Sequence, residues 1–468
     1  MIKDMTVGSP IKLIIKFAIP VLIGNIFQQL YNISDILIVG RLIGVEALAA
    51  VGVSAPIFIV LLMISFGFTG GLTVITAQRF GAKDEAGVRS SVVHSLIAST
   101  VLSLMMTLIV LLYLPQILQL MNVPDNILAD AYKFLFVLSS GLVLVVSYNL
   151  LSGFIRALGD SKTPLYFLIF STMLNVLLNF VFIYYLELGV VGSALGTLTA
   201  MTIAVVLCVW YIGRKFPILC LRREDWKFNP AFMHEHLNVA VPMALQFSVI
   251  ALGLIIIQAV CNSFGSDTIA AFTSALRIEQ LATSTLVALG FGVATYTAQN
   301  YGAGKIGRIR RGVVRTSLIS LLFSIFIALF VRFGGENMIG LFIKNGDENI
   351  INIAKGYLDI STLFYFFLGQ IFIFRNALQG MGQSVIPMIA SVIELLMRSF
   401  AAVYLATKMG YAGIYYASPI AWVGAALVVS VGYWHTIRQL KYRLREKLSR
   451  QHMKFASIQA EAETVPAE

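Results

Sequence analysis

Long apolar blocks alternate with short polar stretches along most of the 468 residues. About 20 apolar residues in a row are enough for a helix to cross the hydrocarbon core of a membrane. Blocks of this kind begin near Ile11, Ala47, Val92, Ala131, Pro164, Val190, Leu237, Thr268, Val313, Ile353, Pro387 and Gly410. The pattern predicts an all-α integral membrane protein with about twelve transmembrane helices.

The chain also repeats itself at a spacing of about 221 residues. Residues 76–82 read TAQRFGA and residues 297–303 read TAQNYGA, while GVEALAAVG from Gly44 pairs with GSDTIAAFT from Gly265. The repeat predicts two pseudo-symmetric six-helix lobes. We expect an N-terminal lobe over residues 1–213, a cytoplasmic linker over 214–236, a C-terminal lobe over 237–440 and a cytoplasmic basic tail over 441–468.

Composition supports the membrane assignment. Hydrophobic residues make up 58% of the chain and charged residues 12%, compared with about 25% charged residues in a soluble domain. The mean hydropathy is +0.85. Three dispersed cysteines, Cys208, Cys220 and Cys261, indicate neither a disulfide framework nor a metal site. We expect no cofactor beyond a coupling ion, and no cleavable targeting segment.

The net charge of +11 comes from basic residues that gather in alternate loops, without the aromatic interleaving of a nucleic-acid-binding face. By the positive-inside rule, these loops and both termini are expected to be cytoplasmic, in a multi-pass protein of the cell inner (plasma) membrane. An even number of helices per lobe makes the two repeats parallel. The basic residues include Arg79, Lys83, Arg89, Arg156, Lys162, Arg214, Lys215, Arg222, Arg223, Lys227, Lys305, Arg308, Arg310 and Arg311.

Asp35 lies midway in the first apolar block, where an ionised carboxylate costs several kcal/mol (roughly 3) unless it is paired, hydrated or protonated. Tyr31 precedes it by one helical turn and Gln28 by two, so one face presents a carboxylate, a phenol and an amide. We expect Gln28 and Tyr31 to line the substrate cavity. No basic residue lies within that span. We therefore expect Asp35 to hold a proton or a cation; the alternative is that it caps a helix break or is hydrogen-bonded to a neighbour.

Asn175 and Asn179 lie one turn apart in the fifth block, and Thr197 follows in a sixth block rich in Gly and Ala. Their oxygen atoms suit a hard cation. The alternative is that the two amides only form hydrogen bonds that hold neighbouring helices together.

The second half has lost the acidic position, because Ile257 stands near the place that symmetry assigns to Asp35. It has Glu394 and Arg398 instead, four residues apart in the eleventh block, where they can pair along one helix face. We favour a structural ion pair over a role in ion coupling or substrate contact. Arg277 and Glu279 lie near the start of the eighth block.

The duplicated motif contains Gln78 with Gly81, and Gln299 with Gly302. We expect it to end the second and eighth helices at the cytoplasmic face, where glycine permits the left-handed turn that stops a helix. A hinge or anchor is favoured over substrate binding.

The chain resembles the multidrug and toxic compound extrusion (MATE) family of the MOP flippase superfamily, over about residues 10 to 440. The features that carry the resemblance are the first-helix pattern from Pro20 to Ala50, the run RALGDSKTP at 156–164, Asn175-x-x-x-Asn179 and the duplicated Gln-x-[Phe/Tyr]-Gly-Ala. The resemblance implies two lobes that form a V around a central cavity and rock between inward- and outward-open states. It also places Asp35, Asn175, Asn179 and Thr197 in a first-lobe cation site.

The function that we expect is H⁺- or Na⁺-coupled antiport of organic, mostly cationic, substrates by a monomer in contact with membrane lipids, and not catalysis. Many relatives have Asp where this chain has Asn179, so we favour protons, with Na⁺ at Asp35 as the alternative. A lipid or lipid-linked oligosaccharide flippase would need a cavity lined with cations, and an enzyme would need clustered His, Asp or Glu at the membrane surface. A channel fits a single buried acid less well than alternating access does.

Overall fold

The computed structural model describes residues 3–340 and 348–463, and every regular element in these ranges is a helix. The side chains of Tyr31 and Asp35 lie outside the described residues. The α-helices are α1 (Pro10–Leu42), α2 (Val45–Gly81), α3 (Glu85–Leu120), α4 (Asp125–Ser140), α5 (Leu142–Ala157), α6 (Lys162–Phe180), α7 (Gly189–Lys215), α8 (Pro230–Asn262), α9 (Ser266–Gly302), α10 (Ile306–Gly340), α11 (Glu348–Leu363), α12 (Tyr365–Gly380), α13 (Val385–Met409) and α14 (Ile414–Glu463). The short elements are the π-helix η1 (Val181–Tyr185) and the 3-10 helices η2 (Pro217–Leu219), η3 (Arg223–Asp225) and η4 (Gly410–Gly413).

The predicted twelve spans are confirmed. Nine spans in the described ranges are long and apolar enough to cross a membrane, and two bent pairs, α4 with α5 (44°) and α11 with α12 (51°), raise the number to eleven. The last of the nine spans, residues 385–444, includes both α13 and most of the apolar part of α14, and these two helices pack side by side. Counting α13 and α14 separately gives twelve.

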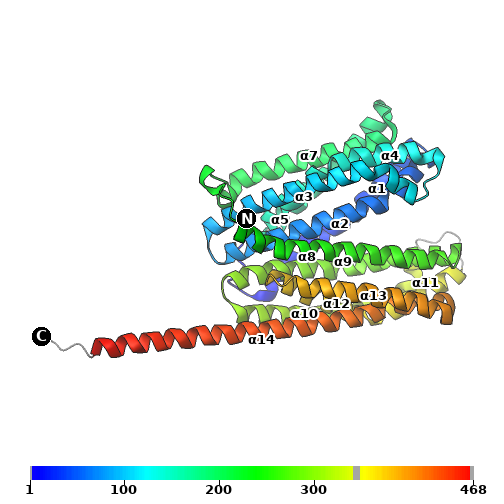
Figure 1. The fold of residues 1–468 in the computed structure, drawn as a ribbon. Helices are drawn as coiled ribbons and strands as arrows, with labels where there is room; N and C mark the ends of the chain where they lie inside the picture. Colours follow the sequence, from blue (N-terminus) through cyan, green and yellow to red (C-terminus); the bar gives the residue numbers. More distant parts are fainter. Residues whose placement is uncertain (1–2, 341–347, 464–468) are drawn as a thin grey trace.

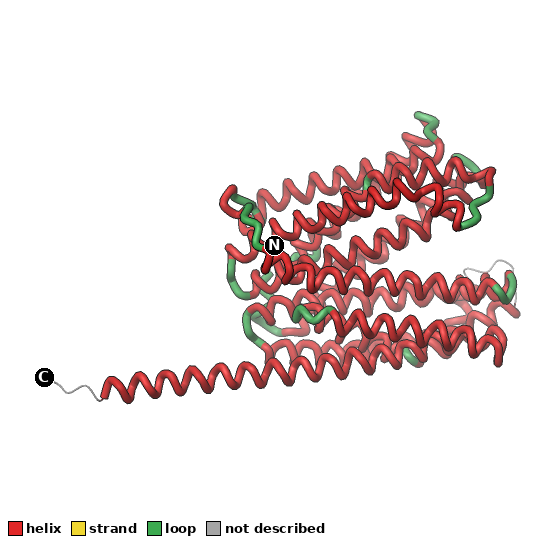
Figure 2. Tube along the Cα trace, in the orientation of Figure 1, coloured by secondary structure: helices red, strands yellow, loops and turns green. Residues whose placement is uncertain are grey.

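The helices run side by side between two ends of the molecule (Figure 1). We call the end with the N-terminus and the loops at 82–84, 158–161, 216–229, 303–305 and 381–384 the basal end, and the opposite end the distal end. Most loops lie at these two ends, and helix fills most of the space between them (Figure 2), with single-residue breaks at Gly141 and Phe364 in the two bent pairs. The basic residues of the alternate loops therefore gather at the basal end, as their spacing predicts.

Local sequence explains where several helices begin. Asp84 caps α3 by accepting a hydrogen bond from the Gly87 N–H at 2.8 Å. Asn229 caps α8, and Pro230 occupies its first position. Gly44 and Gly265, which the repeat pairs with each other, both have positive φ (125° and 90°) in the distal turns before α2 and α9. Glycine adopts this backbone conformation without strain, so the same turn recurs in both lobes.

Two boundaries differ from the expected ones. The helix α8 begins at Pro230, inside the expected linker, because Asn229 and Pro230 together start a helix. The basic tail is continuous with the helix α14, which extends beyond the bundle at the basal end (Figure 1).

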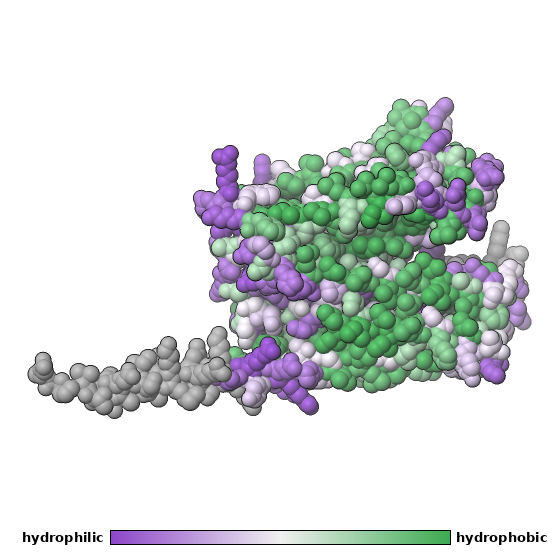
Figure 3. Space-filling model, viewed as in Figure 1, coloured by the Kyte–Doolittle hydropathy of each residue, from purple (hydrophilic) through white to green (hydrophobic). Residues whose placement is uncertain are grey.

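The buried apolar clusters show how the two lobes meet. One basal cluster joins Leu72 of α2 to Ala240 and Met243 of α8, and a second joins Ile14 of α1 to Val293 of α9. Each lobe therefore packs its first helix against the other lobe. The clusters toward the distal end each lie within one lobe, and the surface is hollowed between the lobes there (Figure 3). The lobes join at the basal end and diverge toward the distal end.

Candidate functional site

Three of the four predicted cation-site residues form one polar row in the N-terminal lobe, with both asparagines buried and Thr197 half-buried. The amide of Asn175 in α6 donates to the Thr197 hydroxyl of α7 at 3.1 Å, and the amide of Asn179 donates to the Asn175 oxygen at 3.2 Å. Asn175 is 3% exposed and Asn179 is fully buried. The one-turn spacing read from the sequence therefore places both amides on the face of α6 that meets α7.

The backbones of α6 and α7 approach closely at this row. A β-carbon built on Gly196 would lie 2.1 Å from the Asn179 side-chain oxygen, and one on Gly192 would lie 3.1 Å from the Phe182 carbonyl group. Two residues after Asn179, the helix widens into the π-helix η1. Such widened turns are frequent at functional sites, and the glycines of α7 leave room for this one.

The backbone of Asp35 lies in α1, which packs along α6. A β-carbon on Gly24 of α1 would lie 3.5 to 3.6 Å from the Leu165 and Leu168 side chains of α6. Gln28, one turn further along α1, is half-buried. The predicted parts of the site are therefore on adjacent helices, although the side chains of Asp35 and Tyr31 lie outside the described residues.

In the C-terminal lobe, the predicted pair between Glu394 and Arg398 exists, with Arg398 Nη2 2.5 Å from Glu394 Oε1. The sequence did not predict that a third charged residue belongs to this ion-pair cluster. Arg375 of α12 reaches the other carboxylate oxygen of Glu394 at 3.1 Å, and all three side chains are at most 10% exposed. The four-residue spacing on α13 reveals the pair, whereas nothing local to Arg375 indicates a partner on another helix.

A second carboxyl group lies in the same lobe. Glu279 of α9 accepts a hydrogen bond from the Tyr357 hydroxyl of α11 at 2.8 Å. Arg277, two residues earlier in α9, is exposed and takes no part in this contact. The phenol supplies the hydrogen bond that a carboxyl group needs when it leaves water.

The duplicated motif lies at the basal ends of α2 and α9, but the prediction of its turn is wrong. Gly81 and Gly302 are the last helical residues, and positive φ occurs further on, at Lys83 (60°) and Gly304 (68°). The two glycines serve close packing instead. A β-carbon on Gly81 would lie 2.0 Å from the Gln299 carbonyl oxygen, and one on Gly302 would lie 1.8 Å from that of Gln78.

The linker after α7 is docked on the N-terminal lobe and is not a free tether. Asp225 of η3 pairs with Arg89 of α3 at 3.2 Å. The backbone N–H of Asn229 donates to Nε2 of the buried His94 at 3.0 Å. These contacts hold the linker against the basal end of α3.

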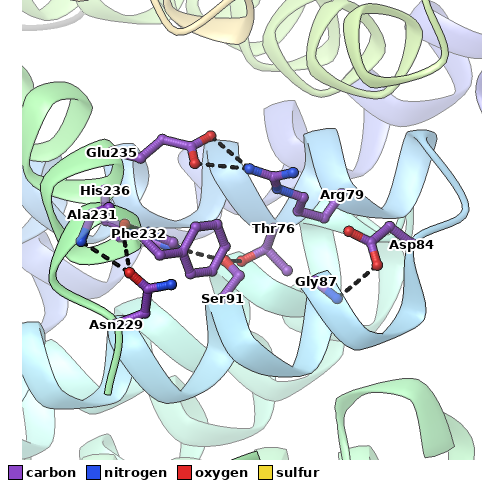
Figure 4. A network of polar contacts seen from close by, with 10 residues as sticks. All are labelled: Thr76, Arg79, Asp84, Gly87, Ser91, Asn229, Ala231, Phe232, Glu235 and His236. Atoms are coloured by element: carbon purple, nitrogen blue, oxygen red, sulfur yellow. Dashed lines mark hydrogen bonds and ion pairs between the residues drawn. The ribbon is translucent and has the colours of Figure 1, made fainter. Parts of the chain in front are cut away.

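The start of α8 is bound to α2 and α3 by a further polar network (Figure 4). The Arg79 guanidinium points toward Glu235, with the closest pair of atoms 2.8 Å apart. His236 and Thr76 both contact the Ser91 hydroxyl at 2.8 Å. The basal junction between the lobes is therefore polar as well as apolar.

Among the residues that the structure describes, no group of three or more His, Cys, Asp and Glu could hold a metal ion. The chemistry available in the N-terminal lobe is that of neutral oxygen and amide groups beside the helix that carries one carboxylate. Such a set can hold a proton on the carboxylate or coordinate a hard monovalent cation.

Comparison with known proteins agrees with this architecture. The MatE family model matches the chain twice, over residues 20–181 and 242–404. The probable multidrug resistance protein YpnP of Bacillus subtilis (strain 168) is 28% identical over 393 residues, which cover 84% of this chain and 87% of that protein. The probable multidrug resistance protein YoeA of the same organism is 26% identical over 440 residues, which cover 91% of this chain and 93% of YoeA.

Solved structures share the whole fold. A structure described as the outward-facing conformation of a multidrug resistance MATE family transporter of the MOP superfamily superposes with a TM-score of 0.86 at 25% identity. The match covers 94% of this chain and 98% of that one. A MATE structure in the bent conformation gives a TM-score of 0.87 at 25% identity, over 93% of this chain and 97% of that one.

Proposed function

This chain belongs to the MatE family of multi-pass membrane transporters, and from that premise we propose that it is a cation-coupled antiporter that exports organic, mostly cationic, small molecules. The relatives YpnP and YoeA are named as probable multidrug resistance proteins, which supports this substrate class. The lobes alternate between opening at the basal end and opening at the distal end, and a cation moves inward as the substrate moves outward.

The observation that carries the proposal is the hydrogen-bonded row of Asn175, Asn179 and Thr197, whose two asparagines are buried, beside α1, the helix that contains Asp35. Polar groups at this depth are costly in an apolar environment, and they are retained where they bind an ion or substrate. The glycines of α7 leave the row little freedom to rearrange. In this proposal Asp35 and the row together supply the ligands of the ion.

We favour the proton as the coupling ion. The site has one carboxylate and otherwise neutral groups, so a single proton neutralises it completely. Dehydrating Na⁺ with one charge and a few amide oxygens is less favourable than with two carboxylates. The identity of the residue at 179 is therefore decisive, since an aspartate there would supply the second charge.

The basal end faces the cytoplasm in this proposal, and the protein lies in the plasma membrane. Arg79, Arg89, Arg222 and Lys305 all lie at the basal end, and the positive-inside rule assigns such an end to the cytoplasm. The joined basal end and divergent distal end then correspond to an outward-facing state. The similarity to a solved transporter described as outward-facing supports this assignment.

The positions of the buried arginines give little support to the alternative function, a lipid or lipid-linked oligosaccharide flippase. Arg375 and Arg398 would be the cations for a pyrophosphate, but they share the Glu394 carboxylate. One of their two positive charges is therefore already balanced inside the C-terminal lobe.

The test is export of a fluorescent organic cation from proteoliposomes in which pH and sodium gradients are imposed separately. A pH gradient alone should drive export by the wild type, and Asp35→Asn should abolish it while the protein still folds and inserts. Asp125→Asn, at the exposed start of α4, is the matched control and should transport like the wild type. Export by Asp35→Asn at the wild-type rate would remove Asp35 from the mechanism.

A further inference from the structure

The duplicated motif has a reciprocal arrangement that ion coupling does not require. Gln78 and Gly81 occupy the last turn of α2 in one lobe, and Gln299 and Gly302 occupy the last turn of α9 in the other. We call these four residues the clasp. The copy of the motif in one lobe packs against the copy in the other lobe at the basal end.

The glycines of the clasp determine how closely the two helix ends approach. The position of a β-carbon on Gly81 overlaps the Gln299 backbone, and that on Gly302 overlaps the Gln78 backbone, with distances of 2.0 and 1.8 Å to the carbonyl oxygens. Backbone atoms cannot move away as a flexible side chain can. Any residue larger than glycine at either position would push α2 and α9 apart.

The glutamines of the clasp form matching hydrogen bonds across the lobes. The Gln78 amide donates to the Gly380 carbonyl at 2.9 Å, and the Gln299 amide donates to the Ala157 carbonyl at 2.8 Å. Gly380 and Ala157 are the last residues of α12 and α5, and carbonyl groups at helix ends have no partner inside their own helix. Each glutamine therefore caps a helix of the opposite lobe.

The N-terminal segment reinforces one side of the clasp. The Met5 N–H donates to the Gln299 side-chain oxygen at 2.7 Å, while the Lys3 N–H donates to the Leu158 carbonyl of the N-terminal lobe at 2.9 Å. Lys305 of the C-terminal lobe donates to the Thr6 carbonyl at 3.1 Å. Met5 and Thr6 are buried. This segment thus bridges the two lobes directly over the clasp.

We infer that the clasp of Gln78, Gly81, Gln299 and Gly302 is the closing contact of the basal gate, which forms when the transporter is open at the distal end and separates as a unit when the basal end opens. The two halves make reciprocal contacts at one place between the lobes, so one rigid-body rotation of the lobes breaks both glutamine–carbonyl hydrogen bonds and both glycine contacts together. The inference rests on the proposed function, since it assumes that the lobes alternate.

The test measures the basal opening directly. Two nitroxide spin labels are placed at Lys162→Cys and Gln383→Cys, after Cys208, Cys220 and Cys261 have been replaced. Both positions are exposed, the first at the start of α6 and the second in the basal loop before α13. Pulsed electron paramagnetic resonance then gives the distribution of distances across the basal end in lipid nanodiscs, without substrate or gradient. A short distance should dominate in the otherwise unchanged protein.

Gly81→Ala and Gly302→Ala should each raise the population with a long basal distance by about tenfold, which corresponds to about 1.4 kcal/mol. Gly213→Ala is the matched control, because it lies in α7, where a β-carbon would meet nothing within 4 Å. It should leave the distribution unchanged. If the two clasp variants also show the unchanged distribution, the clasp does not hold the gate and the inference is wrong.

The glutamines provide a second route if a glycine variant fails to fold. The double variant Gln78→Ala/Gln299→Ala removes three hydrogen bonds without adding an atom: those to the Gly380 and Ala157 carbonyls and the one from the Met5 N–H. It should shift the distances in the same direction. Gln439→Ala, at an exposed position of α14, is its control. A distribution that matches this control would overturn the inference as well.

The outcome is independent of ion coupling. If the protein exports no drug, but its clasp variants open at the basal end, the proposed function is wrong and the inference about the clasp still holds. A protein that exports drugs on a pH gradient while its clasp variants show unchanged distances would contradict the clasp alone.

Discussion

Gly196 lies directly against Asn179, because a β-carbon at position 196 would come within 2.1 Å of the asparagine side-chain oxygen and 3.2 Å of its backbone nitrogen. The glycine of α7 and the amide of α6 therefore fit only in the absence of a side chain at 196. This contact fixes the position of the polar row that we propose as the cation site.

Gly196→Ala should therefore impair transport while leaving the fold intact. The added methyl group must displace the Asn179 side chain, and the ligand geometry of the row then changes. We expect a loss of export of about tenfold or more, because small displacements in a site carry large rate costs. Gly213→Ala in the same helix should transport normally, since nothing lies within 4 Å of its β-carbon. Equal export by the two variants would show that the row is not part of the site.

Asn179→Asp should increase the dependence of export on sodium. The substitution adds a second carboxylate to the row, one turn from Asn175, and two carboxylates offset the dehydration of Na⁺ better than one. The measurement is export at constant pH with and without a sodium gradient. Unchanged ion dependence in this variant would exclude α6 from the site, and a sodium requirement in the wild type would contradict proton coupling.

Glu394→Gln should destabilise the protein, because it leaves the buried guanidinium groups of Arg375 and Arg398 without a counter-charge. Breaking a buried ion pair from one side costs about 3–5 kcal/mol. The double variant with Arg398→Met should recover part of the loss, and adding Arg375→Met should recover more. Thermal unfolding in detergent provides the measurement.

The control for this series is Asp359→Asn, whose partner Arg332 has a 65% exposed side chain. Exposed pairs contribute about 0–1 kcal/mol, so this variant should unfold near the wild-type temperature. If Glu394→Gln is as stable as the wild type but fails to transport, the charged group has a functional role and our structural interpretation is wrong.

The contact between Asp225 and Arg89, which helps to dock the linker, should not change between about pH 6 and 8. The Arg222 backbone N–H, followed by the Arg89 guanidinium, holds the pKa of Asp225 below its usual 3.8. A carboxyl group with a depressed pKa in the folded state stabilises that state above its unfolded value and loses this effect only as the pH falls through the folded value. The contact is therefore fully formed throughout the physiological range.

Limited trypsin digestion after Arg222, Arg223 and Lys227 measures this docking. Asp225→Asn should be cleaved faster than the wild type at both pH values, whereas Glu224→Gln, on the exposed side of the same turn, should behave like the wild type. Wild-type protection that disappears between pH 8 and about pH 6 would show that another titrating group holds the linker.

The sequence alone determined the elements of the protein and their number. Apolar blocks of membrane-spanning length are a property of the local chain, so twelve spans and two repeats could be read without coordinates. The same holds for contacts within one helix. The spacings of Asn175 with Asn179 and of Glu394 with Arg398 follow from 3.6 residues per turn, and both pairs meet in the structure.

Only the tertiary structure decided which faces of different helices meet. Arg375 pairs with Glu394, and the Tyr357 hydroxyl donates a hydrogen bond to Glu279. The two copies of the duplicated motif pack against each other, and their glycines do not form the predicted turns. Such contacts depend on the rotation of each helix about its axis and on its shift along its neighbour. Both are set by the packing of many side chains at once, and no local spacing in the sequence records them.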